Sequence, residues 1–343
     1  MSDTPRSSAP SPAERVHRFL AEEARWSRLE IAFWIVGFAL AFVFRSNHLL
    51  FAEIAILALF AVSLDLILGY AGIVSLGHAA FFGLGAYTVG IMARSGWGDP
   101  LTGLAAAAVV AGLLGFATSF LVLRGSDLTR LMITLGVASL LHETANKLDW
   151  LTGGADGLQG MMVGPVLGRF AFDLYGTTAY VYALSVLFVV VVGLRVLVHS
   201  PFGHALRAIR DNPLRARAIG IPVGRRLVAA YTLAAAVAGI AGALLAQTSG
   251  FASLDVLEFH RSAEVMLVLV IGGSGRLYGG ILGAIVFRLA QDGIATLTPQ
   301  YWQFWIGLGL VVLVIAGRDR LETIARRLVG RLVPRSAIEE TAR

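Results

Sequence analysis

Long apolar stretches separated by short polar ones run through most of the chain. A helix needs about 20 mostly apolar residues to cross the hydrocarbon core of a bilayer. This rule predicts ten transmembrane segments, at roughly 31–47, 50–68, 79–94, 101–123, 131–146, 179–198, 227–248, 263–274, 279–297 and 302–317. The segment 263–274 is too short to span alone. We therefore expect an all-α integral membrane protein of about ten transmembrane helices, with broken or re-entrant segments.

Arginines in the polar segments predict the orientation of these helices. They gather in 124–130, in 199–226 and after residue 317, whereas the loop 147–178 holds more acidic than basic residues. Cytoplasmic loops of membrane proteins carry an excess of Lys and Arg. The first three segments are therefore expected inside the cell and 147–178 outside. Ten spans with both termini cytoplasmic satisfy this assignment, and eight spans also satisfy it if one helical hairpin is re-entrant.

The two ends of the chain are polar. The hydrophobic run begins only at Ile31, and Glu22, Glu23 and Glu30 precede it, which does not fit a cleaved signal peptide. We expect a cytoplasmic N-terminal tail over 1–30, a transmembrane domain over 31–317 and a cytoplasmic C-terminal tail over 318–343.

Composition supports a membrane environment. Hydrophobic residues make up 57% of the chain and charged residues only 15%, whereas soluble domains carry roughly 25% charged residues. The net charge of +6 comes from arginine, because Lys147 is the only lysine. In a membrane protein this charge marks cytoplasmic loops and contacts with anionic headgroups. We therefore expect the lipid bilayer, and no nucleic acid, as a partner.

Glycines and polar residues interrupt the apolar pattern at 69–78, in the sequence GYAGIVSLGH. Non-helical backbone at membrane depth must be buried in protein or line a water-filled cavity. The segment is therefore either a helix break beside a transport pathway or an ordinary cytoplasmic turn. Asp65 lies just before it and fits two roles: holding the broken segment, or binding a substrate ammonium group. The candidate pathway residues are Asp65, Gly72, Ser75, Gly77 and His78.

A second stretch, 202–222, combines arginines with apolar residues at three- to four-residue spacing, as on one helix face. Pro213 can open a second short helix, with Asn212 or Asp211 as its cap. Gly220 is then suited to stop that helix. Such an element either sits in a groove of a partner protein or lies on lipid headgroups.

A third stretch, 271–280, is dense in glycine and follows the short apolar run 263–274. This arrangement predicts a sharp cytoplasmic turn or a half-helix around Gly272, Gly273 and Gly275.

Motifs for catalysis are missing from the sequence. Lys147 is followed by leucine, so the chain has no phosphate-binding loop of the Walker A type. His142 and Glu143 begin a zinc-protease motif, but Asn146 stands where the second histidine is needed. Cysteine is absent, which excludes thiolate chemistry and disulfides. We expect no catalytic residue, no metal site and no cofactor in this chain.

Four separated segments resemble one family. They are 69–88 (GYAGIVSLGHAAFFGLGAYT), 152–158 (TGGADGL), 206–221 (LRAIRDNPLRARAIGI) and 262–284 (SAEVMLVLVIGGSGRLYGGILGA). In this order they are similar to the branched-chain amino-acid ABC permease family, the Liv-type permeases, and the resemblance covers most of 50–317. The length, the polar N-terminal tail and the TGGADGL loop fit the longer of that family's two permeases.

The resemblance implies a type II-like importer permease in a bacterial inner membrane. Its implied partners are a second homologous permease subunit, two ATP-binding subunits that hold ATP and Mg²⁺, and a periplasmic substrate-binding protein. The loop 199–226 would be the coupling loop that docks on an ATPase, and the break at 69–78 would line the route. The implied docking residues are Arg207, Arg210, Asp211, Asn212, Pro213, Arg217 and Gly220.

The ligand stays open at this point. Ile73 and Val74 stand where the family leads us to expect a polar residue such as Gln, and relatives carry other amino acids, urea, short amides or aromatic acids. The rival hypothesis is a proton-coupled secondary transporter that uses Asp65, His142 or Glu143 and needs no docking loop. A membrane enzyme is a third hypothesis, which the missing motifs disfavour.

Overall fold

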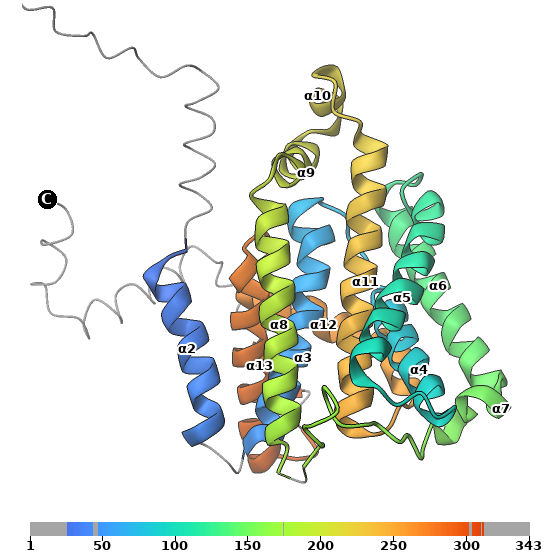
Figure 1. Cartoon of the computed structure of the whole chain (residues 1–343). Helices are drawn as coiled ribbons and strands as arrows, with labels where there is room; N and C mark the ends of the chain where they lie inside the picture. The colour runs from blue at the N-terminus through green and yellow to red at the C-terminus, as the bar shows by residue number, and fades with distance from the viewer. Residues whose placement is uncertain (1–25, 44–46, 174, 302–303, 310, 312–343) are drawn as a thin grey trace, which may run out of the picture. The chain divides into compact units, whose positions relative to one another are not determined.

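The computed structural model describes residues 26–43, 47–173, 175–301, 304–309 and 311 (Figure 1). Helices dominate these residues, and the only strand-like pairs among them are two isolated bridges, Leu158 with Ala252 and Val166 with Phe170. The predicted all-α class is therefore confirmed. Most of the predicted N-terminal tail and the whole predicted C-terminal tail lie outside the described residues.

The predicted apolar segments form helices. They are α2 Arg28–Val43, α3 His48–Asp65, α4 Ala79–Arg94, α5 Pro100–Val122, α6 Asp127–Lys147, α8 Thr177–Val198, α11 Val223–Ser249, α12 Phe259–Gly272 and α13 Leu277–Leu297. The last predicted segment, 302–317, falls largely outside the described residues. Where both are described, predicted and observed boundaries agree to within four residues.

Five helical stretches in the described part of the chain are long and apolar enough to cross a membrane. These are His48–Tyr70, Pro100–Val122, Thr177–Val198, Val223–Ser249 and Leu277–Leu297. α6 is as long as these but carries charge near both ends, in the ion pairs Arg130–Asp127 (2.8 Å) and Lys147–Glu143 (3.3 Å).

The chain divides into two units after Ala284. In the first unit α11 packs against both α4 and α5 (Figure 1). Small residues allow the close approach: a methyl group added to Gly85 would overlap the backbone of Gly239, and one added to Gly242 would overlap the carbonyl of Phe82. Such small-residue contacts are the usual way in which membrane helices pack without a hydrophobic driving force.

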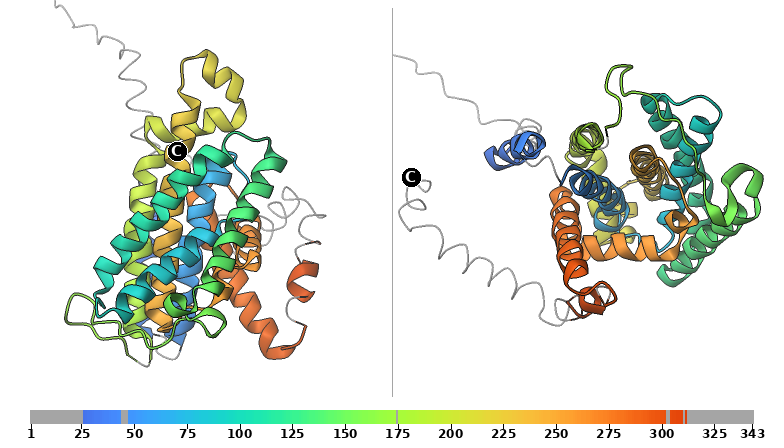
Figure 2. Two further views of the ribbon diagram at one scale, coloured as in Figure 1. Left: turned by 90° about the vertical axis from the view of Figure 1, so that its right-hand side faces the viewer. Right: turned by 90° about the horizontal axis from the view of Figure 1, so that it is seen from below.

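Two helices of the first unit are shorter than the hydrocarbon core of a bilayer is thick. α4 has 16 residues and α12 has 14, which correspond to lengths of about 24 and 21 Å against a hydrocarbon core of about 30 Å. α12 lies across the bundle (Figure 2, right view). The backbone N–H of Ala79, at the start of α4, donates to Ser262 Oγ in the first turn of α12 at 2.9 Å. The short segment expected at 263–274 is thus present. The segment 79–94, which was expected to span the membrane, is also short, and the first turns of the two helices meet.

Candidate coupling and pathway site

The helix break predicted at 69–78 is present. α3 ends at Asp65 and continues as a short π-helix, η2 Leu66–Tyr70, before the backbone leaves helical geometry until Ala79. Gly72 has φ +71°, a conformation that favours glycine. The N–H of Ile73 donates back to the carbonyl of Ile67 at 2.8 Å, which closes the end of η2. π-Helical turns of this kind are frequent at functional sites.

Asp65 ties the break to the glycine turn. Its side chain is fully buried, and Oδ1 accepts a 2.6 Å hydrogen bond from the backbone N–H of Gly275. Gly69 lies at the same contact, where an added methyl group would overlap the nitrogen of Gly275. Of the two roles that the sequence left open for Asp65, this geometry favours holding the broken segment.

The glycine turn itself has the sharp geometry that the sequence predicts. α12 ends at Gly272, and Gly273 and Gly275 adopt φ +93° and +78°. A methyl group on Gly272 would overlap the carbonyl of Gly279. The turn therefore folds tightly onto the start of α13, and it presents the N–H of Gly275 to Asp65.

Two arginines of the loop 199–226 hold the same break. They lie on α9 Pro201–Asp211. Nη1 of Arg210 donates to the carbonyl of Gly69, and a methyl group on Gly72 would lie 2.8 Å from Arg210 Cγ. The guanidinium of Arg207 lies over the ring of Tyr70, 5.4 Å from its centroid. Three stretches that are far apart in sequence therefore meet at η2.

The predicted loop 199–226 contains two short helices, the second of which opens at Pro213 as expected, and its last four residues already belong to α11. α9 is capped by Ser200, whose Oγ accepts from the N–H of Phe202 at 3.2 Å. α10 Pro213–Ala218 is capped by Asn212, whose Oδ1 accepts from the N–H of Arg215 at 3.0 Å. Asn212, and not Asp211, is therefore the cap. Gly220 follows α10 with φ +86°, as expected of a helix stop.

The residues of the predicted apolar face in this loop do not all share one environment. Leu206 and Ile209 are buried within the chain, whereas Pro213, which shares their spacing, is exposed. The exposed apolar residues are instead Leu214 (74% exposed) and Ile219 (69%) on and after α10. Asp211 and Arg217 are exposed on the same segment. The surface open to a partner is thus α10, which projects beyond the bundle at the top of Figure 1.

Ser75, Gly77 and His78 lie in packed interior. Ser75 and His78 have no exposed surface. His78 Nε2 is 2.9 Å from Ser63 Oγ, and its ring stacks on Phe60 at 5.5 Å between centroids. An added methyl group at Gly77 would overlap the carbonyl of Thr134 on α6. In this conformation these residues join helices, and their role in a pathway stays a prediction.

Several polar partners were not singled out from the sequence. Ser63, Thr134 and Ser262 bind the break or the start of α4, but a single Ser or Thr in an apolar helix carries little signal. Arg195 was detectable, because it stands within the apolar segment 179–198. It pairs with Glu30 at 2.6 Å and joins α8 to α2.

The other two residues considered for proton coupling, His142 and Glu143, both lie on α6. Glu143 is exposed and pairs with Lys147 at 3.3 Å. Within the ranges that the structure describes, no group of three or more His, Asp or Glu side chains is placed to hold a metal ion.

Five helices long and apolar enough to cross a membrane, together with interrupted helices, are typical of a multi-helix membrane protein of the transporter type. Over residues 48–315 the chain matches the family described as branched-chain amino acid transport system, permease component, and it belongs to that family. The resemblance found in the sequence is thereby confirmed.

Three relatives show the range of the family. The chain is 28% identical over 285 residues to the high-affinity branched-chain amino acid transport system permease protein LivM of Escherichia coli strain K12, covering 76% of this chain and 65% of LivM. It is 31% identical over 293 residues to the autoinducer 2 import system permease protein LsrC of Enterobacter sp. strain 638, covering 81% of this chain and 80% of LsrC. It is 23% identical over 290 residues to LivH of E. coli K12, covering 78% and 93%. No solved structure matches the chain.

Proposed function

We propose that this chain is the permease subunit of an ABC importer in a bacterial inner membrane. It carries branched-chain amino acids or related small carboxylates inward, and separate partner subunits bind and hydrolyse ATP with Mg²⁺. The observation that supports this most strongly is the contact of Arg210, on the arginine-rich loop, with the carbonyl of Gly69 at the helix break. The loop that would receive the ATPase is joined directly to the segment that would open.

The proposed mechanism is a population shift between two states of the break. An ATPase subunit docks on the exposed surface of α10, through Leu214, Arg217 and Ile219. Displacement of α9 then moves Arg207 and Arg210, and with them η2 and the glycine turn at Gly275. ATP binding drives transport only if the partner favours one of the two states over the other.

The interior of the break is suited to a polar solute or to water. Asp65 Oδ2, Ser75 Oγ and His78 Nδ1 are buried and have no hydrogen-bond partner among the described residues. Buried polar atoms are normally paired, with protein or with ordered water. Opening of the break would expose these atoms to a passing ligand, which supports the pathway role proposed for this segment.

Family membership supports a proposal for the assembly. We propose a second homologous permease subunit, two ATP-binding subunits and a periplasmic substrate-binding protein as partners. The chain is proposed to have about ten membrane segments with both termini cytoplasmic, since this places the arginine-rich segments inside. The names of LivM and LsrC refer to different solutes, so the ligand is the least constrained part of the proposal.

Charge reversal on the loop tests this function. Arg210→Glu combined with Arg217→Glu should abolish ATP-dependent uptake and the co-purification of an ATPase subunit, with normal amounts of the chain in the membrane. Arg169→Glu, on the exposed loop that we place on the opposite side, is the matched control and should leave both unchanged. Normal uptake by the double variant would overturn the docking role.

A further inference from the structure

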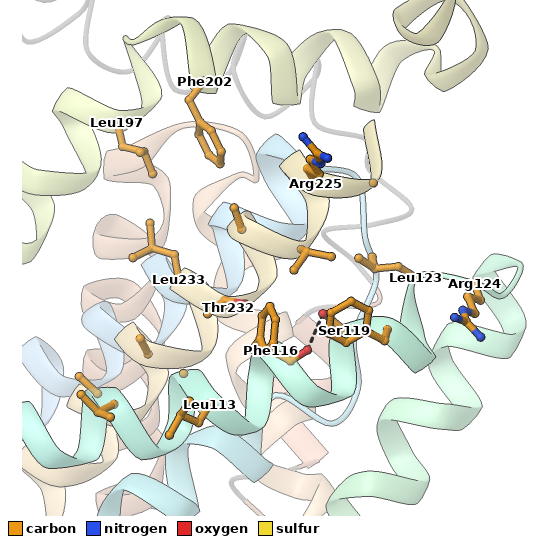
Figure 3. A pocket seen from close by; sticks show the side chains of 18 residues that line it. Leu113, Phe116, Ser119, Leu123, Arg124, Leu197, Phe202, Arg225, Thr232 and Leu233 are labelled. Carbon is orange, nitrogen blue, oxygen red and sulfur yellow. Dashed lines mark hydrogen bonds between the residues drawn. The ribbon is translucent and has the colours of Figure 1, made fainter. Parts of the chain in front are cut away.

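An apolar groove of about 1110 Å³ runs along the outside of α5 and α11 (Figure 3). Its walls include Leu113 and Phe116 from α5, Leu233 from α11 and Phe202 from α9. The volume exceeds the roughly 300–1000 Å³ typical of pockets for small ligands. The site described above does not use this groove, because Asp65, Gly275 and Arg210 are absent from its lining.

The groove is apolar along its length and basic at one end. Arg124 follows the end of α5, and Arg225 lies in the first turn of α11. The two helices run in opposite directions, so both arginines fall at the same end of the groove. Both are exposed, and neither forms an ion pair with a carboxylate in the part of the chain that the structure describes. Figure 3 shows both guanidinium groups beyond the apolar lining, on either side of Leu123.

The start of α11 adds backbone donors to this basic end. The first N–H groups of an α-helix have no acceptor within the helix, and the residue before α11 is Pro222, which supplies no side-chain cap. The N–H of Val223 donates to the carbonyl of Ile221 at 2.9 Å, so the donors at this end are the N–H groups of Gly224 and Arg225. Gly224 lines the groove, and no atom lies within 4 Å of where its side chain would be. A helix start beside two guanidinium groups is complementary to a phosphate.

We propose that this groove binds one anionic phospholipid. An acyl chain lies between α5 and α11, and the phosphodiester headgroup contacts Arg124 and Arg225. Charge decides between a lipid and a protein helix as the occupant: an apolar helix leaves two arginines without partners, whereas an anionic headgroup pairs with both. Basic pockets between transmembrane helices are known to hold anionic headgroups.

The bound lipid also contacts the coupling loop. Phe202, which forms one wall of the groove, lies in the first turn of α9, and the guanidinium of Arg226 lies 5.2 Å from the centroid of its ring. The lipid therefore occupies the angle between α9 and the membrane helices, on the element that also carries Arg207 and Arg210.

Lipid retention by the purified full chain tests the proposal. The chain, with any partners that co-purify, is exchanged into detergent containing equal amounts of phosphatidylglycerol and phosphatidylcholine, and bound lipids are counted by native mass spectrometry. We expect one retained phosphatidylglycerol per chain. Arg124→Gln with Arg225→Gln should retain it roughly tenfold less, because two charge-assisted contacts are lost. Arg28→Gln removes an exposed arginine outside the groove and should change nothing.

A groove-filling variant tests whether lipid retention requires the apolar groove or only the positive charge of the two arginines. Ala229→Trp places a large side chain in the groove and leaves both arginines in place, and it too should lose the lipid. Equal retention of the two lipids by the unmodified chain, or unchanged phosphatidylglycerol retention by the double glutamine variant, would overturn the proposal.

A photo-reactive amino acid at Leu113, which is 62% exposed, identifies the occupant in native membranes. An adduct with the mass of a phospholipid supports the proposal, and an adduct with another protein subunit contradicts it.

Discussion

The carboxylate of Asp65 accepts a 2.6 Å hydrogen bond from the backbone N–H of Gly275, which is 210 positions further along the chain. This bond joins the end of α3 to the turn between α12 and α13. Arg210 binds the carbonyl of Gly69 beside it. The helix break, the glycine turn and the arginine-rich loop are therefore one connected site, and each of these links can be tested separately.

Removing the Asp65 carboxylate should destabilise the protein. Asp65→Ala leaves the partly buried N–H of Gly275 without its acceptor, at a cost of about 1–3 kcal/mol. Asp65→Asn keeps an acceptor oxygen and should cost less. Thermal unfolding in detergent measures both. Loss of uptake by Asp65→Asn at unchanged stability would contradict the holding role and favour proton coupling through this residue.

Two variants of the arginine-rich loop should distinguish binding of the ATPase from transmission of its movement to the helix break. Leu214→Asp changes the exposed surface of α10 and should prevent ATPase co-purification. Arg210→Gln leaves that surface intact but removes the charged donor to the carbonyl of Gly69, so the ATPase should still co-purify and hydrolyse ATP without uptake. Parallel assays of co-purification, ATP hydrolysis and uptake distinguish the two. Normal uptake by Arg210→Gln would show that this contact does not transmit the movement.

Even the smallest side chain at Gly77 should be harmful. Gly77→Ala places a methyl group against the carbonyl of Thr134, and overpacking of this kind typically costs about 1–3 kcal/mol. Gly136→Ala is the control. Gly136 lies on α6, as Thr134 does, but no atom lies within 4 Å of the methyl group that this substitution adds. We expect a lower unfolding temperature for the first variant and an equal or higher one for the second. Equal stability of both would contradict the tight packing at Gly77.

The absence of cysteine makes the topology directly testable. Met162→Cys and Leu214→Cys place single thiols at positions that are 82% and 74% exposed, in the loop 147–178 and on α10. A membrane-impermeant maleimide added to intact spheroplasts should label the first thiol, and should label the second only after permeabilisation. Labelling of both thiols in intact cells, or the reverse pattern, would overturn the proposed orientation.

The helices and their breaks could be predicted from the sequence because the signals are local. A run of apolar residues defines α5 or α8, and Asn212 before Pro213 is a helix start whatever surrounds it. The glycines at 69–78 and at 271–280 likewise mark broken backbone without any knowledge of their partners.

What the sequence did not predict depends on contacts between distant residues. Nothing near Asp65 indicates that its acceptor oxygen meets Gly275. Leu206 and Ile209 have the spacing of a helix face, but spacing alone does not tell whether that face meets a partner or the chain's own core. In the structure this face packs into the core of the chain. In the sequence Ser262 does not differ from other small residues of apolar helices. Only the structure shows that its hydroxyl accepts a hydrogen bond from the first N–H of α4.

The most direct test of the account is uptake of leucine into proteoliposomes that contain the chain, its co-purifying partners and the binding protein, with and without ATP on the side of the arginine-rich loop. We predict uptake that requires ATP and is lost with Arg210→Gln. Uptake driven by a proton gradient in the absence of ATP would contradict the importer mechanism.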